Sequence, residues 1–432
     1  MADRMPVKPV FRKPELLAPA GNPEKLETAV RFGADAVYLA GNRFGLRAGA
    51  DNFTADEMRD GIGFAHAHGK KAYLALNILA HNRDIETLPA YLDIALQTHP
   101  DAVIAADPGV MALVRAADPD MPIHLSTQAN TTNHGAALFW HGVGIKRIVL
   151  ARELSMQEVL DMRERCPESL ELEMFVHGAM CMSYSGRCML SHYLTGRDAN
   201  RGDCAQPCRW QYGVVEEKRP GEYFPVIADE RGTYLFNSRD LCLLRRIPSL
   251  LQIGLSSLKI EGRMKSSFYV ATVVKAYREA IDSAWNGNWN ESDVVRWERE
   301  VASVSNRGNT EGFWNGTPGP EAQKSETGGY QRGSDFVALV PMEAESAQIP
   351  SGVWRVQLEQ RNRFYMTDHL ECLSPHGPSF PIRLMALYDA DMNPIDVAPH
   401  PQMKLFADLS EKLVPGSLLR RPASDTGPAG SY

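Results

Sequence analysis

Residues 15–41 read ELLAPAGNPEKLETAVRFGADAVYLAG, in which two short apolar runs flank an amphipathic stretch. The runs ELLAPAG and DAVYLAG have the length and composition of buried strands. Between them, Asn22 can cap a helix whose first position is Pro23, and Gly33 stands where that helix would end. The stretch therefore predicts a strand–helix–strand unit of a parallel sheet.

The same unit recurs along the chain. Two further helix starts, at 54–57 and 155–158, have the sequence of capping boxes. Six more strand-like runs follow the opening pair: KAYLALN, DAVIAAD, PIHLSTQ, KRIVLAR, LELEMFVH and SSLKIEG. Eight strand–helix units in about 280 residues favour an α/β fold of the (β/α)8-barrel type over an open doubly wound sheet. No GxGxxG motif follows the first strand, so a dinucleotide-binding sheet has no support.

In such a barrel, the residues that close the strands face the active site. The strand-closing residues here are Asn77, Asp107, Gln128, Arg152, His177 and Glu261. A segment far longer than an ordinary connection follows the seventh strand, and long insertions usually carry function. We therefore expect functional residues at the strand ends and in the insertion at about 177–242.

The composition changes after the barrel pattern. We assign 1–305 to the barrel domain and the Gly-, Thr- and Ser-rich residues 306–333 to a linker. Residues 334–420 contain five strand-like runs separated by turns, which predicts a small β-barrel-like domain. Residues 421–432 have the composition of a disordered tail.

Charge and hydropathy indicate a soluble protein. The net charge is −7, and no apolar run is long enough to span a membrane. The N-terminus lacks the apolar core of a secretory signal, so we expect a cytoplasmic protein with reduced thiols. Residues 187–265 carry 13 Lys and Arg against 9 Asp and Glu, a local excess that could steer a phosphate-bearing partner to this segment. Scattered solvated charge explains the count equally well.

Five of the seven cysteines lie close together in the sequence: Cys181, Cys188, Cys204, Cys208 and Cys242. Their spacing contains no paired C-x2-C of a zinc ribbon and no CxxxCxxC of a radical S-adenosylmethionine enzyme. An iron–sulfur cluster tolerates irregular spacing, because a long loop can wrap around it. A cluster, a zinc site and a set of small apolar residues all remain open; we interpret Cys166 and Cys372 as buried apolar residues.

A resemblance narrows these alternatives. The segments EMFVHGAMC at 173–181 and SGRCMLS at 185–191 resemble the signature of the collagenase-like U32 peptidase family. The opening segment, LKIEGRMKS at 258–266 and NRGNTEGF at 306–313 are similar to other family segments, and the β-rich tail is similar to the family's C-terminal module. The resemblance covers about residues 14–315.

The resemblance implies RNA chemistry instead of proteolysis. It is strongest to the branch that converts the wobble uridine of tRNA to 5-hydroxyuridine without oxygen. Members of this group carry a 4Fe-4S cluster, with prephenate implicated as the hydroxyl donor, and require an electron donor that the sequence does not identify. The implied cluster ligands are Cys181, Cys188, Cys204 and Cys242. Cys208 is then the spare thiol, close enough in sequence to replace Cys204.

Other residues are candidates for catalysis and binding. Glu173 and Glu261 could act as general acid or base, or could form structural salt bridges. His177 could donate a proton or be a structural histidine. An anionic co-substrate needs cations, for which Arg187 is the best-placed candidate. The weaker cationic candidates are Arg47, Arg209, Lys259 and Arg263.

Aromatic and arginine side chains alternate in the insertion, a combination that can stack an unpaired base and hold phosphates. They are Tyr184, Tyr193, Trp210, Tyr212, Arg197, Arg201 and Arg209.

Two alternatives to the hydroxylase stay open. A peptidase could use Cys181 with His177, although the chain has no GxSxG or HExxH motif. A zinc-stabilised binding protein would need no chemistry.

Overall fold

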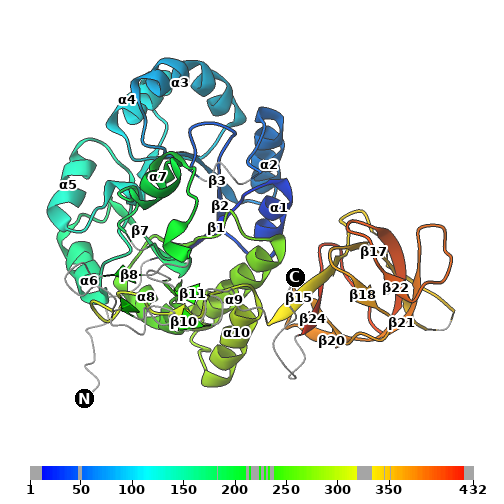
Figure 1. The fold of residues 1–432 in the computed structure, drawn as a ribbon. Coiled ribbons are helices and arrows are strands. Elements are labelled where there is room, and N and C mark those ends of the chain that lie inside the picture. Colours follow the sequence, from blue (N-terminus) through cyan, green and yellow to red (C-terminus); the bar gives the residue numbers. More distant parts are fainter. Residues whose placement is uncertain are drawn as a thin grey trace.

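The computed structural model describes residues 12–46, 51–181, 183–210, 214–215, 223–224, 228–229, 232–233, 238–318, 333–344, 346–350 and 352–422. Eight parallel strands form a closed barrel (Figure 1), because the last of them, β13, pairs with both β1 and β7. The strands are β1 (Glu15–Pro19), β2 (Ala36–Leu39), β3 (Lys71–Leu76), β4 (Ala102–Ala105), β5 (Ile123–Leu125), β6 (Arg147–Val149), β7 (Glu171–Gly178) and β13 (Ser257–Ile260). The predicted barrel is confirmed.

Helices surround the barrel, and their first residues carry the predicted caps. The Asn22 Oδ1 accepts from the Lys25 amide at 2.9 Å, and capping boxes form at Thr54 and Ser155. The helices are α1 (Pro23–Arg31), α2 (Ala55–Ala67), α3 (Asn82–Ala95), α4 (Pro108–Ala117), α5 (His134–Gly142), α6 (Met156–Arg165), α8 (Ile247–Ile253), α9 (Ser267–Trp285) and α10 (Glu291–Ser303).

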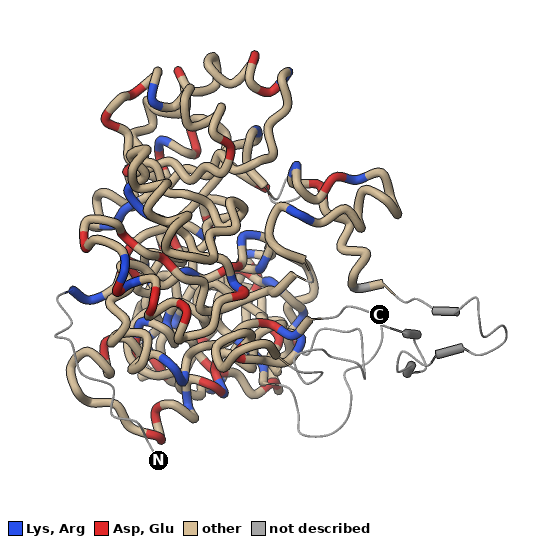
Figure 2. Tube along the Cα trace, turned by 90° about the vertical axis from the view of Figure 1, so that its left-hand side faces the viewer, with Lys and Arg blue, Asp and Glu red and all other residues tan. Residues whose placement is uncertain are grey.

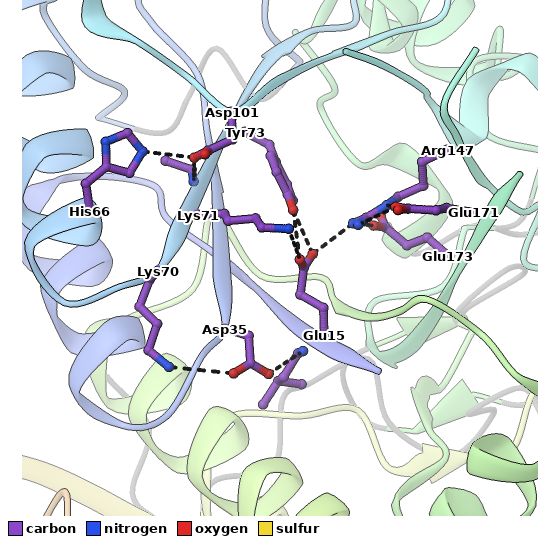
Figure 3. A network of polar contacts seen from close by, with 12 residues as sticks. Glu15, Asp35, His66, Lys70, Lys71, Tyr73, Asp101, Arg147, Glu171 and Glu173 are labelled. Atoms are coloured by element: carbon purple, nitrogen blue, oxygen red, sulfur yellow. Dashed lines mark hydrogen bonds and ion pairs between the residues drawn. The ribbon is translucent and has the colours of Figure 1, made fainter. Parts of the chain in front are cut away.

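The barrel interior holds a layer of buried charges. The Arg147 Nη1 lies 2.8 Å from a carboxylate oxygen of Glu15 and 3.1 Å from one of Glu173, while Nη2 lies 2.7 Å from Glu171 (Figure 3). The Tyr73 hydroxyl donates to Glu15 at 2.8 Å. Barrel interiors of this fold are usually filled by branched apolar side chains, so this layer departs from the common pattern.

The insertion between β7 and α8 lies over one end of the barrel, where Figure 1 shows α7 across the opening. Its β12 runs antiparallel to β7 and parallel to β14. The elements of the insertion are α7 (Leu190–Thr195), η3 (Ala199–Arg201), η4 (Pro207–Arg209), β8 (Val214–Val215), β9 (Tyr223–Phe224), β10 (Ala228–Asp229), β11 (Gly232–Thr233) and β12 (Asp240–Cys242), whereas its partner β14 (Asn309–Thr310) follows α10 in the chain.

The first part of the expected linker packs on the barrel domain. Arg307 is buried and contacts Asp240 at 2.5 Å, and the Trp314 side chain is 4% exposed. The barrel domain thus extends past residue 305, because β14 and Arg307 attach the segment to β12 and Trp314 is buried in the barrel core. Residues 319–332 of the expected linker and 423–432 of the expected tail lie outside the described residues.

The C-terminal domain is a nearly closed barrel of antiparallel strands with its own apolar core, as predicted. Its main sheet has the order β20-β19-β24-β15-β17-β23-β21, with β16 on β17, and β18 pairs with β22. The strands are β15 (Ser334–Leu339), β16 (Ser346–Gln348), β17 (Trp354–Gln360), β18 (Phe364–Tyr365), β19 (Leu370–Leu373), β20 (Phe380–Ile382), β21 (Leu384–Tyr388), β22 (Val397–Ala398), β23 (Lys404–Leu409) and β24 (Leu418–Pro422).

Specific contacts join the two domains. The rings of Phe268 and Phe336 stack at 5.5 Å, and the buried Lys275 ammonium donates to the Ser374 carbonyl at 2.6 Å.

Basic and acidic residues are interspersed throughout the barrel domain (Figure 2). No helix within the described ranges has the length and apolarity to cross a membrane.

Substitution of the buried Arg420 tests how much the contacts between the two domains stabilise the protein. Its guanidinium contacts Glu300 of α10 at 2.5 Å and Glu371 of β19 at 2.8 Å. We expect Arg420→Met to lower the free energy of unfolding by about 3 kcal/mol, because it leaves a partly buried carboxylate unpaired. The neighbouring Arg421 bridges Asp335 and Asp368 within one domain and is 31% exposed. Arg421→Met should cost under about 1 kcal/mol; equal losses in urea unfolding would contradict the assigned role of Arg420.

Candidate functional site

A pocket lies at the carboxyl ends of the barrel strands, beneath the insertion. Four of the six predicted strand-closing residues line it: Asn77, Gln128, Arg152 and Glu261. The other two have different roles. The Asp107 carboxylate caps α4 by accepting from the Gly109 and Val110 amides, and His177 is buried outside the lining.

Four of the five clustered thiols line this pocket: Cys181, Cys188, Cys204 and Cys208. The fifth, Cys242, lies on β12 with its sulfur 3.9 Å from the Tyr277 hydroxyl, and burial raises the pKa of Cys242 to about 11. Within the described residues, no group of three or more His, Cys, Asp or Glu is placed to hold a metal ion. The structure therefore brings Cys208, and not Cys242, to the pocket beside the other three.

Backbone contacts fix the start of the insertion. Gly178, the last residue of β7, has φ +110°, and a Cβ there would lie 2.5 Å from the Glu261 carbonyl oxygen. Only glycine fits this close approach and this conformation without strain. The turn that leads to Cys181 is thereby pressed against the end of β13.

Arg201 anchors the next part of the insertion to the barrel. Its two terminal nitrogens contact the Asp84 carboxylate at 2.6 and 3.0 Å, and this pair lowers the pKa of Asp84 to about 2. The adjacent Asn200 donates from Nδ2 to the Cys188 carbonyl at 3.0 Å. Arg197 likewise pairs with Asp203 at 2.7 Å. These two arginines, predicted to hold phosphates, are engaged in ion pairs within the protein.

Lys259 connects the pocket to the charges inside the barrel. It lines the pocket, and its ammonium lies 3.0 Å from the Glu173 carboxylate and 4.5 Å from the Tyr38 ring centre. Burial alone would raise the pKa of Glu173, but Lys259 and Arg147 outweigh it and lower the pKa to about 2. Glu173 is thus a buried ion-pair partner, the structural alternative that the sequence left open.

The remaining acid–base candidates differ in position. Glu261 lines the pocket, and its carboxylate lies 4.0 Å from the Arg152 guanidinium. His177 is 2% exposed, its ring faces those of Tyr269 and Tyr277, and burial lowers its pKa to about 4. Of the three residues predicted to be catalytic, only Glu261 reaches the pocket.

Some of the cations predicted to bind an anion line the pocket, and others do not. Lys259 and Arg263 line the pocket, whereas Arg187 is exposed and lies outside the lining. Arg47, Tyr212 and the Arg209 side chain lie outside the described residues. Arg152 was predicted to lie at a strand end but was not among the predicted binding residues. Its position among the strand-closing residues was the signal that could have identified it as a cation of the pocket.

Three aromatic side chains of the insertion are accessible, and one of them lies at the pocket. Tyr184 lines it and is 48% exposed, while Tyr193 on α7 is 84% exposed and Trp210 is 44% exposed. Exposed aromatic rings of this kind are available to stack on an unpaired base.

Comparison with known proteins identifies the family. Residues 21–324 match Peptidase family U32, and residues 332–420 match the Peptidase family U32 C-terminal domain. This chain belongs to peptidase family U32. It spans nearly the whole length of a Bacillus subtilis relative named tRNA hydroxylation protein P1, with 40% identity over 95% of this chain and 96% of that protein.

Two other relatives carry different names. This U32 protein is 37% identical to the Escherichia coli tRNA hydroxylation protein P over 84% of this chain and 87% of the relative. It is 35% identical to a Porphyromonas gingivalis collagenase over 70% of this chain and 72% of the relative. Family membership alone is therefore compatible with more than one named activity.

The buried pair below the pocket predicts a pH dependence. Because folding lowers the pKa of Glu173 from 4.5 to about 2, its ion pair stabilises the fold above pH about 4.5. That contribution, about 3 kcal/mol, is lost as the pH falls towards 2. We expect Glu173→Gln to lower the melting temperature at pH 7 and the difference from wild type to shrink below pH 4.5.

Glu171→Gln is the matched control, because Glu171 contacts the same arginine but is 20% exposed. Its effect at pH 7 should be smaller than that of Glu173→Gln. A Glu173→Gln difference that stays constant in melting curves from pH 7 to 3 would show that Glu173 is not held as a buried carboxylate.

Proposed function

We propose that this U32 protein hydroxylates a base of tRNA without molecular oxygen, converting the wobble uridine to 5-hydroxyuridine. The observation that carries the proposal is the pocket, where four thiols, three cations and one carboxylate meet at the active end of a barrel. Two relatives that span most of the chain are named tRNA hydroxylation proteins, which supports the same chemistry.

The thiols suit an iron–sulfur cluster. Cysteine thiolates are the usual ligands of a 4Fe-4S cluster, and four of the five clustered cysteines line the pocket in which the substrate would bind. We assign Cys181, Cys188, Cys204 and Cys242 as the ligands, which is the set that the family resemblance implies. Cys208 competes with Cys242 as the fourth ligand, because Cys208 lines the pocket and Cys242 does not. When bound, the cluster would supply one-electron transfer.

The cations suit a small anionic co-substrate, proposed to be prephenate. Lys259 and Arg263 line the pocket and would bind carboxylate groups, with Lys259 oriented by Glu173 and the Tyr38 ring. Glu261 lies opposite Arg152 in the same pocket, where it can hold or accept the proton released from the uracil ring.

The rim of the pocket suits an unpaired nucleotide. A wobble uridine lies in a loop whose bases can leave the stack, and such bases are held on aromatic side chains. Tyr184 lies at the pocket itself, and the exposed rings of Tyr193 and Trp210 belong to the same insertion. These rings would hold the target base and its neighbours.

The peptidase alternative has a specific weakness. Its dyad would join Cys181 and His177, but Cys181 lines the pocket and His177 does not. The His177 ring is buried among the rings of α9, where a peptide could not reach it. A nucleophile and its base must lie within hydrogen-bond reach of one another.

Nucleoside analysis tests the proposed activity. We expect expression of this chain to restore 5-hydroxyuridine in tRNA of a bacterial strain that lacks the modification. Glu261→Gln should reduce the amount on the order of a hundredfold, because it removes a proton acceptor from the pocket. Tyr193→Ala should affect the yield less. Absence of the nucleoside with a stable, cluster-loaded protein would disprove the assigned substrate.

Cysteine substitutions test the cluster. After anaerobic purification we expect about four irons and four sulfides per chain, with absorption in the visible range. Serine at Cys181, Cys188, Cys204 or Cys242 should abolish this content. Serine at Cys208, or at the buried Cys166 as a control outside the pocket, should leave it intact. Loss of iron in Cys208→Ser with retention in Cys242→Ser would show that Cys208 is the fourth ligand in place of Cys242. Stoichiometric zinc in the purified protein would refute the iron–sulfur cluster.

A further inference from the structure

Arg152 has a place in the pocket that its internal contacts do not explain. Its side chain is 7% exposed and lines the pocket at the end of β6. The guanidinium lies 4.3 Å from the Phe175 ring centre, so one of its faces is covered. A guanidinium this deeply buried normally has most of its donors in hydrogen bonds.

Few of these donors are used by the protein. Nη1 donates to the Ala179 carbonyl at 2.6 Å, and Nη2 lies 4.0 Å from the Glu261 carboxylate, beyond ordinary hydrogen-bond length. Within the described chain, Nε is a buried donor with no hydrogen-bond partner. A buried cation left partly unsatisfied in this way is costly unless a ligand supplies the missing acceptors.

The contact to Ala179 gives Arg152 a second role. Ala179 follows Gly178, whose close approach to the Glu261 carbonyl fixes the turn, and it precedes Cys181 by two residues. One guanidinium therefore holds the backbone of the Cys181 segment, lines the pocket and keeps a donor that the protein does not use. A group bound to that donor would be joined to the thiol segment through a single rigid side chain.

We propose that Arg152 is a positioning residue that binds a carboxylate group in the pocket and, through the Ala179 carbonyl, couples that ligand to the Cys181 segment. Together with Lys259 and Arg263 it makes the pocket cationic, with Glu261 as the opposing carboxylate among the described lining residues. The inference rests on the proposed function only in that the natural ligand is the anionic co-substrate; the coupling itself requires neither RNA nor a cluster.

Arg163 provides a matched control. It lies on α6, next in the chain after β6, and its guanidinium donates to the Leu170 and Cys166 carbonyls at 2.8 and 2.9 Å. It thus holds backbone carbonyls near a cysteine, as Arg152 does, but it does not line the pocket. Arg163→Met should match the loss of backbone contacts in Arg152→Met without removing a ligand contact.

The test is hydrogen–deuterium exchange of the reduced, metal-free full chain, with and without malonate as a small dicarboxylate probe. In wild type and in Arg163→Met, malonate should slow exchange in peptides spanning 178–188. In Arg152→Met, basal exchange of these peptides should be at least about tenfold faster, and malonate should give no protection. Arg152→Lys should weaken malonate binding about tenfold or more, because lysine lacks the planar fork.

Several results would overturn the proposal. Malonate protection that persists in Arg152→Met would place the carboxylate elsewhere, and faster exchange of 178–188 in Arg163→Met would reduce Arg152 to a general stabilising role. Equal protection by inorganic phosphate would assign the donors to an RNA phosphate in place of a carboxylate. A chain that shows the expected exchange but carries no iron or 5-hydroxyuridine activity would refute the proposed function and leave the role of Arg152 standing.

Discussion

The structure depends on a cation placed inside a closed barrel. Arg147 lies at the start of β6 and contacts carboxylates from β1 and from two positions of β7. Lys259 and Arg147 together keep Glu173 ionised in the interior, and Glu173 in turn holds the Lys259 ammonium where it lines the pocket. Removing Glu173 would leave the buried Lys259 ammonium without its carboxylate partner. The position of Lys259 in the pocket is therefore set by ion pairs inside the barrel.

The barrel was predictable because its signals are local and repeated. Asn22, Thr54 and Ser155 form the caps that the sequence indicates, and the apolar runs become strands at the expected places. The strand-closing rule also located Asn77, Gln128, Arg152 and Glu261 at the pocket. These predictions require only the direction of each strand, which the alternation of strands and helices determines.

The orientation of individual side chains was harder to predict from the sequence. Residue type and spacing could not distinguish Glu173 from Glu261, because the difference lies in a lysine and an arginine from other strands. Arg201 was expected to face RNA, but its partner Asp84 is distant in the sequence. The extent of the barrel domain was underestimated for the same reason, since Arg307 in a Gly-rich segment pairs with Asp240. Long-range ion pairs of this kind leave no periodic trace in a sequence.

The buried Lys275 gives the domain junction a consequence for the architecture of the chain. Its ammonium satisfies the Ser374 carbonyl, and burial lowers the pKa of Lys275 in this environment. A barrel domain separated from its C-terminal partner would expose the face of α9 that carries Phe268 and Lys275 to water. The sequence has a Gly-rich connection between the two domains, yet the packing makes them one energetic unit. Excising either half as an independent module would require redesign of the surface that the other half now covers.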